Sequence, residues 1–364
     1  MAATQRILSY RLSFNTPAFL GNAEQQAQWR TPPIKALLRQ WWRVVKAPQV
    51  GYDHRCLLDA ENRLFGAAGE EKKPWGQSKI RLRIEQGWDT GSFKPPTGDP
   101  ITHDESPTKK VAANTYLGYG SIGVKNDRTA LEPTTKLAKT LRLRILTDNE
   151  ETTAEATDQV VQAIQLAAWF GGLGSRSRNG FGSMHWTSEG DTPTLHALTI
   201  EALRSVSRPL HTALLCDWPH AIGTDRGGLL IWQTTRTYPT WMAAMKALAV
   251  IKIGLRTSPF FKFHGGSKFG HREPLTRHVL AYPSGRNHQV DAKEWGAGGR
   301  MANQLRLRLH RDGQDGYRGV IVHVPCGVPA FMRQAVRHLP DERLVWETVH
   351  RFFDDCQELE RLKA

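Results

Sequence analysis

Apolar and polar residues alternate along three segments in the first half of the chain. The period of two covers residues 8–14, 80–84 and 141–145. Successive strand side chains point to opposite faces, so this pattern predicts three half-buried strands. Residues 181–186, after a glycine-rich stretch, are expected to form a fourth strand.

Two other segments place apolar residues at spacings of three and four, which is typical of amphipathic helices. They cover residues 32–46 and about 153–170. Thr31 is placed to cap the first helix, and Pro32 takes its first position, where the missing N–H costs nothing. Gly171 is placed to end the second helix in the left-handed conformation. The predicted order is β-α-β-β-α-β, the ferredoxin-like arrangement.

The second half shows similar elements in a less regular order. We expect a strand at 229–235, a helix at 239–254 and a last helix at 341–362. Alternation over 305–309 and 320–324, joined by a turn, predicts a hairpin.

The predicted fold is therefore α+β, with two tandem ferredoxin-like (RRM-like) domains at residues 1–190 and 191–364. The first carries a long insertion at about 87–139, rich in Gly, Pro, Thr and Lys. A loop of that length inside a compact domain is usually functional or disordered. The second domain ends in the last helix.

The net charge of the chain limits the kinds of partner that we expect. The chain has 364 residues, 49 Lys and Arg, 35 Asp and Glu, and a net charge of +14. Such a balance favours a polyanionic partner, nucleic acid first. The four cysteines form no Cys-x-x-Cys pair, which argues against a disulfide framework and a zinc site. The longest apolar run, 166–170, is too short to span a bilayer, and residues 1–20 lack a signal pattern. We expect a cytoplasmic protein with no membrane partner.

The first predicted helix is strongly basic. It carries cations and no acid from residue 30 to residue 46, namely Arg30, Lys35, Arg39, Arg43 and Lys46. Lys35, Arg39 and Arg43 stand four apart on one face and repel one another. A partner or nearby acids must therefore compensate the stripe. Trp42 beside it could stack on a base or on a neighbouring subunit, and a solvated face with core tryptophans is the alternative.

A glycine-rich stretch at 171–182 follows the second helix. Five glycines in twelve residues allow a loop whose backbone N–H groups approach phosphates, and Arg176 and Arg178 add cations. The spacing fits neither a Walker A loop nor a dinucleotide fingerprint. A flexible surface loop is the alternative.

Three segments together resemble a known family. Residues 14–21 with 30–43, ending in Leu-Arg-Gln-Trp-Trp-Arg, are similar to the opening of RAMP-superfamily proteins of CRISPR systems. Residues 61–66, Glu-Asn-Arg-Leu-Phe-Gly, resemble the segment that follows it, and 171–182 resemble the glycine-rich signature loop. The Trp-Trp-Arg version is most similar to the first subunit of Cmr-type (III-B) effector complexes.

The resemblance implies a non-catalytic subunit at the end of the complex that holds the 3′ part of the guide RNA, where it helps to capture target RNA in antiviral defence. Its partners would be guide and target RNA and other Cmr-type RAMP subunits, with no cofactor and no metal. The RNA contacts would fall on the basic helix and on the loop residues Gly174, Ser175, Arg176, Arg178 and Asn179. Asn179 stands where many members have another basic residue.

Two weaker signals remain open. Aromatic residues alternate with cations over 254–278, which suits single-stranded RNA or a structural segment. In the insertion, Tyr116 and Tyr119 could face RNA or a partner, or serve a structural role.

The alternative function is a metal-independent RAMP endoribonuclease that processes CRISPR RNA precursors with a histidine. The candidate histidines are scattered: His103, His185, His264, His271 and His278. Residues 1–53 hold no histidine, and Asp104 and Asp127 are the acids worth testing.

Overall fold

The computed structural model describes residues 4–67, 76–87, 90–106, 108–123, 128–197, 199–263, 270–284, 288–296, 298–313 and 316–362. The chain forms two compact units. Unit 1 comprises Met1–Pro96, Gly118–Val206 and Arg308–Gln314. Unit 2 comprises Thr97–Leu117, Ser207–Leu307 and Asp315–Ala364. The fold is mixed α+β with several antiparallel sheets, as predicted.

Unit 1 is built on a four-stranded antiparallel sheet. Its strands are β1 (Thr4–Phe14), β3 (Ile80–Ile84), β7 (Lys139–Thr147) and β8 (Met184–Glu189). Their spatial order is β3-β7-β1-β8. The predicted strands are confirmed, although β8 begins three residues after residue 181, because the glycine loop continues to Ser183.

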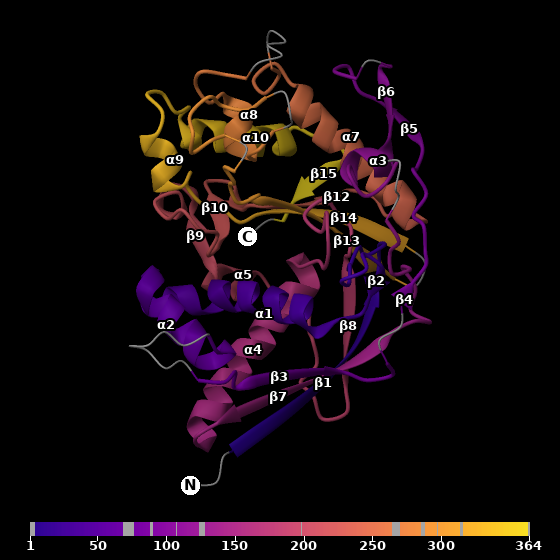
Figure 1. Cartoon of the computed structure of the whole chain (residues 1–364), viewed down its shortest axis with the longest axis vertical. Coiled ribbons are helices and arrows are strands. Elements are labelled where there is room, and N and C mark those ends of the chain that lie inside the picture. The colour runs from indigo at the N-terminus through magenta and orange to yellow at the C-terminus, as the bar shows by residue number, and fades with distance from the viewer. Residues whose placement is uncertain are drawn as a thin grey trace. The chain divides into compact units, whose positions relative to one another are not determined.

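Helices α1 (Thr31–Lys46) and α4 (Glu150–Phe170) pack on each other and on one face of this sheet (Figure 1). That face carries the alternating apolar residues, among them Leu8, Leu141 and Leu143, all fully buried. At about 25 cal/mol per Å² of apolar area removed from water, this layer supplies the main stabilisation of unit 1.

Two predicted helix ends differ from the structure. The N-cap of α1 is Arg30, without a side-chain cap, and Thr31 is already helical. The prediction of a left-handed Gly171 is wrong, because its φ of −88° is extended. Glycine is required there for space. A Cβ would lie 2.6 Å from the Ala167 carbonyl oxygen and 2.9 Å from the Trp41 side chain.

Unit 2 contains most of a second four-stranded sheet. Its strands are β12 (Ile231–Thr234), β13 (Leu305–Asp312), β14 (Gly316–His323) and β15 (Leu359–Arg361), in the order β13-β14-β12-β15. The part of β13 from Arg308 onward is assigned to unit 1. Helices α7 (Trp241–Thr257) and α10 (Glu342–Asp354) separate the strands along the chain. The element order and the strand order therefore match those of unit 1. The prediction of one helix over 341–362 is wrong, because α10 ends at Asp354 and β15 then pairs with β12.

The insertion at 87–139 has secondary structure of its own. It holds β4 (Thr90–Gly91), a β5–β6 hairpin (Pro100–Thr102 and Lys110–Ala112) and the short helix α3 (Ala113–Leu117). Residues Thr97–Leu117 cluster with unit 2, where α3 packs on α7. In its described part, the insertion is therefore more than a loop.

The remaining elements are short connections, apart from helix α2. They are β2 (Ala27–Gln28), η1 (Ala47–Val50), α2 (His54–Phe65), α5 (Ile200–Ser205), β9 (Ser207–Pro209), α6 (Leu210–Ala213), β10 (Ile222–Asp225), β11 (Gly228–Leu229), α8 (Thr276–Leu280) and α9 (Ala330–Gln334). Within the described ranges, every helix is too short or too polar to cross a bilayer.

Candidate nucleic-acid interface

Helix α1 carries the basic stripe, and helix α2 supplies the acid that compensates it. Glu61 of α2 has only 2% of its side chain exposed. Its Oε1 accepts hydrogen bonds from Arg39 Nε and Arg43 Nη2, each at 2.7 Å, and its Oε2 pairs with Arg43 Nε. Two stripe arginines are therefore held by one carboxylate. Glu61 lies in the family-like segment 61–66, which had suggested no such role.

The electrostatics of Glu61 reflect this arrangement. Burial raises the pKa of the carboxyl, but the hydrogen bonds and charges of Arg43 and Arg39 outweigh burial, so the net pKa lies below its usual value. Arg39 and Arg43 keep 32% and 41% of their side chains exposed. The three groups carry a net charge of about +1, and the guanidinium edges that face solvent remain accessible.

The outer cations of the stripe present less free positive charge to solvent than the sequence suggests. Lys46 Nζ pairs with Glu155 at 3.1 Å and donates to Gln49. Burial and the neighbouring Arg39 lower the pKa of Lys35. Arg30 is half-buried at the start of α1, with a buried Nε. The cations thus line one helix as predicted, and acids from α2 and α4 compensate three of them.

Trp42 lies in the core, so the structure contradicts its predicted stacking on a base. Its side chain is 1% exposed, and its Nε1 donates to Gln159 at 3.1 Å. The ring meets Phe65 edge-on, with ring centroids 5.6 Å apart. The alternative of core tryptophans therefore holds for this residue.

The glycine-rich loop is anchored to the segment after β1. Ser175 N–H donates to the Phe19 carbonyl at 3.0 Å, and Gly182 N–H donates to the Pro17 carbonyl at 2.8 Å. The Thr16 hydroxyl donates to the Gly180 carbonyl at 2.6 Å and accepts from Ser183 N–H at 2.9 Å. Several N–H groups that the sequence assigned to phosphates are thus bound within unit 1.

Two glycines of the loop are required by close backbone contact. Gly174 has a φ of +89°, and a Cβ there would lie 2.4 Å from the Phe19 carbonyl oxygen. Gly182 has a φ of +62°, and its Cβ would lie 1.9 Å from the Leu173 carbonyl oxygen. These glycines shape a tight, ordered turn, which is the opposite of a flexible surface loop.

The loop arginines point outward. Arg176 and Arg178 are exposed, and Ser175 and Asn179 are half-exposed. Arg176 has a positive φ of 60°, an uncommon backbone conformation for a residue with a side chain. Asn179 N–H closes the turn on the Arg176 carbonyl at 2.8 Å.

A small cluster forms around Arg176. Arg128 is exposed and lies near Arg176. The partial burial of Arg176 and, after it, the positive charge of Arg128 lower the pKa of Arg176. Gly120 brings the neighbouring Tyr119 close to Arg176, because a Cβ at Gly120 would lie 3.1 Å from Arg176 Nη2. The Tyr119 side chain is 70% exposed. The sequence indicated Tyr119 only weakly and missed Arg128, because these two residues approach residues 174–179 only in the fold. Two cations beside an exposed ring suit a nucleotide.

The aromatic and basic segment at 254–278 is mainly structural where it is described. Phe261 is 1% exposed, and Arg277 is 8% exposed and binds both Glu105 oxygens at 2.9 and 3.0 Å. Phe263 stacks on His288, with centroids 3.9 Å apart. Of the two alternatives left open for this segment, the structural one therefore holds for these residues. Lys268, Phe269 and His264 lie outside the described residues.

Two of the predicted catalytic candidates lie together, because the rings of His271 and His278 meet edge-on with centroids 5.1 Å apart. His103 packs edge-on against Tyr116, which is half-buried. Burial lowers the pKa of His278 to about 4. Asp127 lies outside the described residues. In the part of the chain that is described, no three His, Cys, Asp or Glu side chains form a group that could hold a metal ion.

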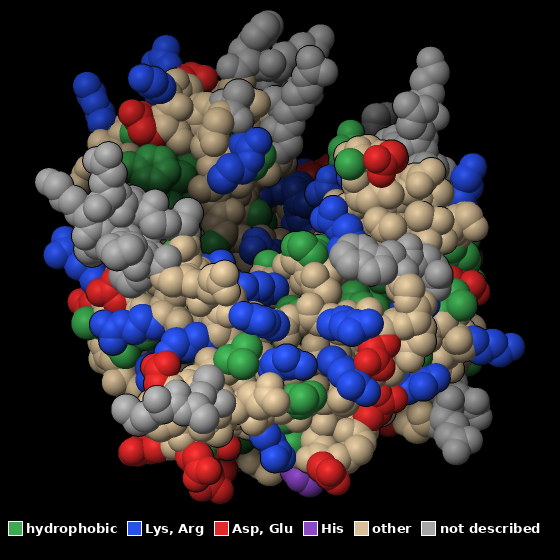
Figure 2. Space-filling model, turned by 60° about the horizontal axis from the view of Figure 1, so that its bottom comes forward, with side chains coloured by type: hydrophobic (Ala, Val, Ile, Leu, Met, Phe, Trp, Pro, Cys, Tyr) green, Lys and Arg blue, Asp and Glu red, His purple; other side chains and the backbone are tan. Residues whose placement is uncertain are grey.

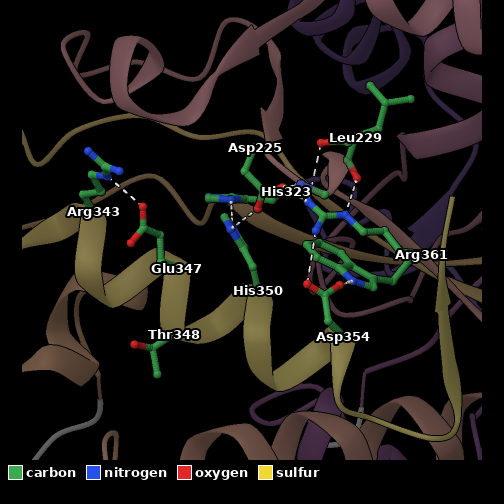
Figure 3. A network of polar contacts seen from close by, with 12 residues as sticks. Asp225, Leu229, His323, Arg343, Glu347, Thr348, His350, Asp354 and Arg361 are labelled. Atoms are coloured by element: carbon green, nitrogen blue, oxygen red, sulfur yellow. Dashed lines mark hydrogen bonds and ion pairs between the residues drawn. The ribbon is translucent and has the colours of Figure 1, made fainter. Parts of the chain in front are cut away.

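A polar network in unit 2 was not anticipated from the sequence (Figure 3). His323 Nδ1 and His350 Nε2 lie 2.9 Å apart, and His350 Nδ1 lies 3.2 Å from Asp225 Oδ2. Arg361 pairs with Asp225 and, at 3.1 Å, with Asp354. Burial first, and then the neighbouring His350, lower the pKa of His323 well below its usual value. The network links β10, β14 and β15 to α10, which indicates a structural role.

Residues 11–185 match the protein family described as RAMP superfamily. The match covers just under half of the 364 residues. The chain is similar to Cmr1 from Pyrococcus furiosus in its apo form, at 16% identity over 89% of this chain and 90% of that chain, with a TM-score of 0.46. It is also similar to a chain of the type III-B Cmr-beta complex bound to cognate target RNA, at 12% identity over 87% and 94%, with a TM-score of 0.46. No curated protein matches.

Proposed function

We propose that this chain is a non-catalytic RNA-binding subunit of a type III-B (Cmr) CRISPR complex. Its place would be at the 3′ end of the guide RNA, where it helps to capture target RNA, with other Cmr-type RAMP subunits as partners. The two sheets, with the same element order and strand order, support two ferredoxin-like domains at about 1–190 and 191–364.

One observation carries the proposal. Within the segment that matches the family, the rigid glycine loop presents Arg176 beside exposed Arg128 and Tyr119. Guanidinium groups bind phosphate through two parallel hydrogen bonds, and an exposed ring can stack on a base. A loop held by backbone contacts keeps these groups in place at little entropic cost.

The site in the proposal differs from the one expected from the sequence. Arg176 and Arg178, with Gly174, Ser175 and Asn179 shaping the turn, remain its centre. Arg39 and Arg43 contribute less to the proposed site than Arg176 and Arg178, because Glu61 binds both of them. Trp42 is left out because it is buried.

The test is a titration of single-stranded RNA at several salt concentrations. Each phosphate contact contributes about 0.7 to the slope of log K against log salt on single strands. Arg176→Ala with Arg178→Ala should flatten the slope by about 1.4. The control is Arg337→Ala with Arg351→Ala, which removes the same charge from exposed positions in unit 2.

An unchanged slope in the loop variant, or an equal loss in the control, would contradict the site. The nuclease alternative has its own test, incubation with repeat RNA in EDTA. A discrete cut that a single His→Ala substitution abolishes would replace the proposed function with metal-independent cleavage.

A further inference from the structure

The outer face of the unit 1 sheet is rich in arginine. Because α1 and α4 pack on the opposite face, the polar positions of the alternating strands point away from both helices (Figure 1). The exposed arginines on this outer face are Arg11 of β1, Arg81 and Arg83 of β3, and Arg142 and Arg144 of β7. Figure 2 shows Lys and Arg side chains gathered across the face of the molecule that lies at the bottom of Figure 1. We call these five residues the arginine face.

The strand register concentrates the charge. Arg81 lies directly opposite Arg144, and Arg83 directly opposite Arg142. Neighbouring strands are about 4.8 Å apart, and residues two apart along a strand are about 7 Å apart. Like charges directly opposite each other destabilise a sheet. The four guanidinium groups therefore form a compact grid that favours an anionic occupant.

The protein neutralises this grid only in part. Arg142 pairs with Glu85 at 2.8 Å, and Arg11 lies 3.8 Å from Glu189. No ion pair joins Arg83 or Arg144 to another described residue. Among the described residues, Arg81 contacts only the neutral Gln77, at 3.5 Å, so the Arg81–Arg144 pair has no acidic partner. The Arg83–Arg142 pair has one, on Arg142.

We propose that the arginine face binds the phosphate backbone of RNA, independently of base sequence, as a second contact surface beside the Arg176 cluster. The inference rests on the proposed function, because it assumes that the chain binds RNA. Arginine matches phosphate with two parallel hydrogen bonds and is more weakly hydrated than lysine.

The composition of the face decides between RNA and an acidic protein. The strand positions that surround the arginine face on the outer side of the sheet include no Phe, Tyr or Trp among the described residues. Ile7, at 43% exposure, is the one large, well-exposed apolar side chain among these positions. The core of a protein interface is depleted in charge and enriched in aromatic residues, whereas nucleic-acid interfaces are polar and basic. Without rings for stacking, the contact would follow the backbone and ignore the bases.

The experiment compares two charge-matched double variants of the full chain. Arg83→Gln with Arg144→Gln alters the arginine face, and Arg337→Gln with Arg351→Gln is the control at exposed positions of unit 2. Binding of two fluorescent single-stranded RNAs of unrelated sequence is measured from low to high salt. We expect the face variant to flatten the slope by about 1.4, equally for both RNAs, and the control to match the wild type.

Each other outcome overturns the inference in a distinct way. If the face variant binds like the wild type while the Arg176 and Arg178 variant is weakened, the arginine face is refuted and the proposed function stands. If the wild-type chain binds no RNA, both are refuted. If polyglutamate binds as tightly as RNA at equal salt, and only the face variant loses it, the occupant is an acidic protein. Photo-crosslinking of thiouridine-containing RNA should mark peptides from β3 and β7, and marks confined to other peptides would also refute the inference.

Discussion

Arg43 of helix α1 is paired with the buried carboxylate of Glu61 of helix α2, and Arg43 Nη2 donates to Glu61 Oε1 at 2.7 Å. Arg39 binds the same carboxylate from the previous helical turn. In the sequence, helix α1 carries a basic stripe with no acid nearby. In the structure, the buried Glu61 binds two arginines of this stripe and so links α1 to α2. Arg39 and Arg43 therefore have a structural role in unit 1, which distinguishes them from the cations that are available to a ligand.

Glu61→Gln should therefore destabilise the protein. Removing the charge leaves two guanidinium groups without their carboxylate. Because the two arginines keep 32% and 41% of their side chains exposed, we expect a loss of about 2 kcal/mol, below the range for a fully buried pair. Urea unfolding measures the loss. The control is Glu155→Gln, whose carboxylate is 63% exposed and pairs with Lys46, and which should cost less than about 0.5 kcal/mol.

The same pair predicts a pH dependence. The pKa of Glu61 is lower in the folded state than in the unfolded chain, where it is about 4.3. Its contribution is therefore present above about pH 4.3 and is lost as pH falls through the folded pKa. The stability difference between wild type and Glu61→Gln should shrink as pH falls from about 5 to 3. A constant difference across this window would contradict the assignment.

Trp42 should act on stability and leave RNA binding unchanged. Trp42→Ala removes a buried ring packed on Phe65 and should cost about 4 kcal/mol. Trp42→Phe keeps an aromatic ring and should fold with a smaller loss. RNA affinity of the folded Trp42→Phe protein should equal that of the wild type. Weaker affinity in a stable Trp42→Phe variant would restore the stacking interpretation.

Tyr119→Ala should weaken RNA binding without changing its salt dependence. The ring is 70% exposed beside Arg176, and stacking of one base contributes about 1–3 kcal/mol. We expect at least a fivefold rise in Kd at fixed salt, with an unchanged slope because no cation is removed. Tyr119→Phe should retain binding, since stacking needs only the ring. A Tyr119→Ala protein with wild-type affinity would exclude this residue from the site.

Arg144→Gln should stabilise the protein slightly. The substitution relieves repulsion with Arg81 directly opposite, and cross-strand pairs of this kind contribute about 0.5 kcal/mol. Arg142→Gln is the matched control, because Arg142 has Glu85 as an ion-pair partner and should gain less. Chemical unfolding of both variants measures the difference. A loss of stability in Arg144→Gln would mean that the arginine is compensated in the folded protein.

The sequence alone determined the regular elements of unit 1. Alternation over β1, β3 and β7 and the helical period of α1 were read correctly, because burial of one face imposes a fixed period on the residues. The family-like motifs and the cations at Arg176 and Arg178 were also visible. Helix ends and β15 were less predictable, because close contacts and strand pairing with distant residues set them.

Only the tertiary structure decided which of these residues are available to a ligand. Glu61 stands 18 positions after Arg43, and no local pattern indicates that it neutralises the stripe. Trp42 is a candidate for stacking in the sequence, and packing buries it. The arginines of β3 and β7 are about 60 residues apart, and strand register places them opposite each other. Charge and aromatic content are properties of the sequence, whereas burial and pairing depend on contacts between distant segments.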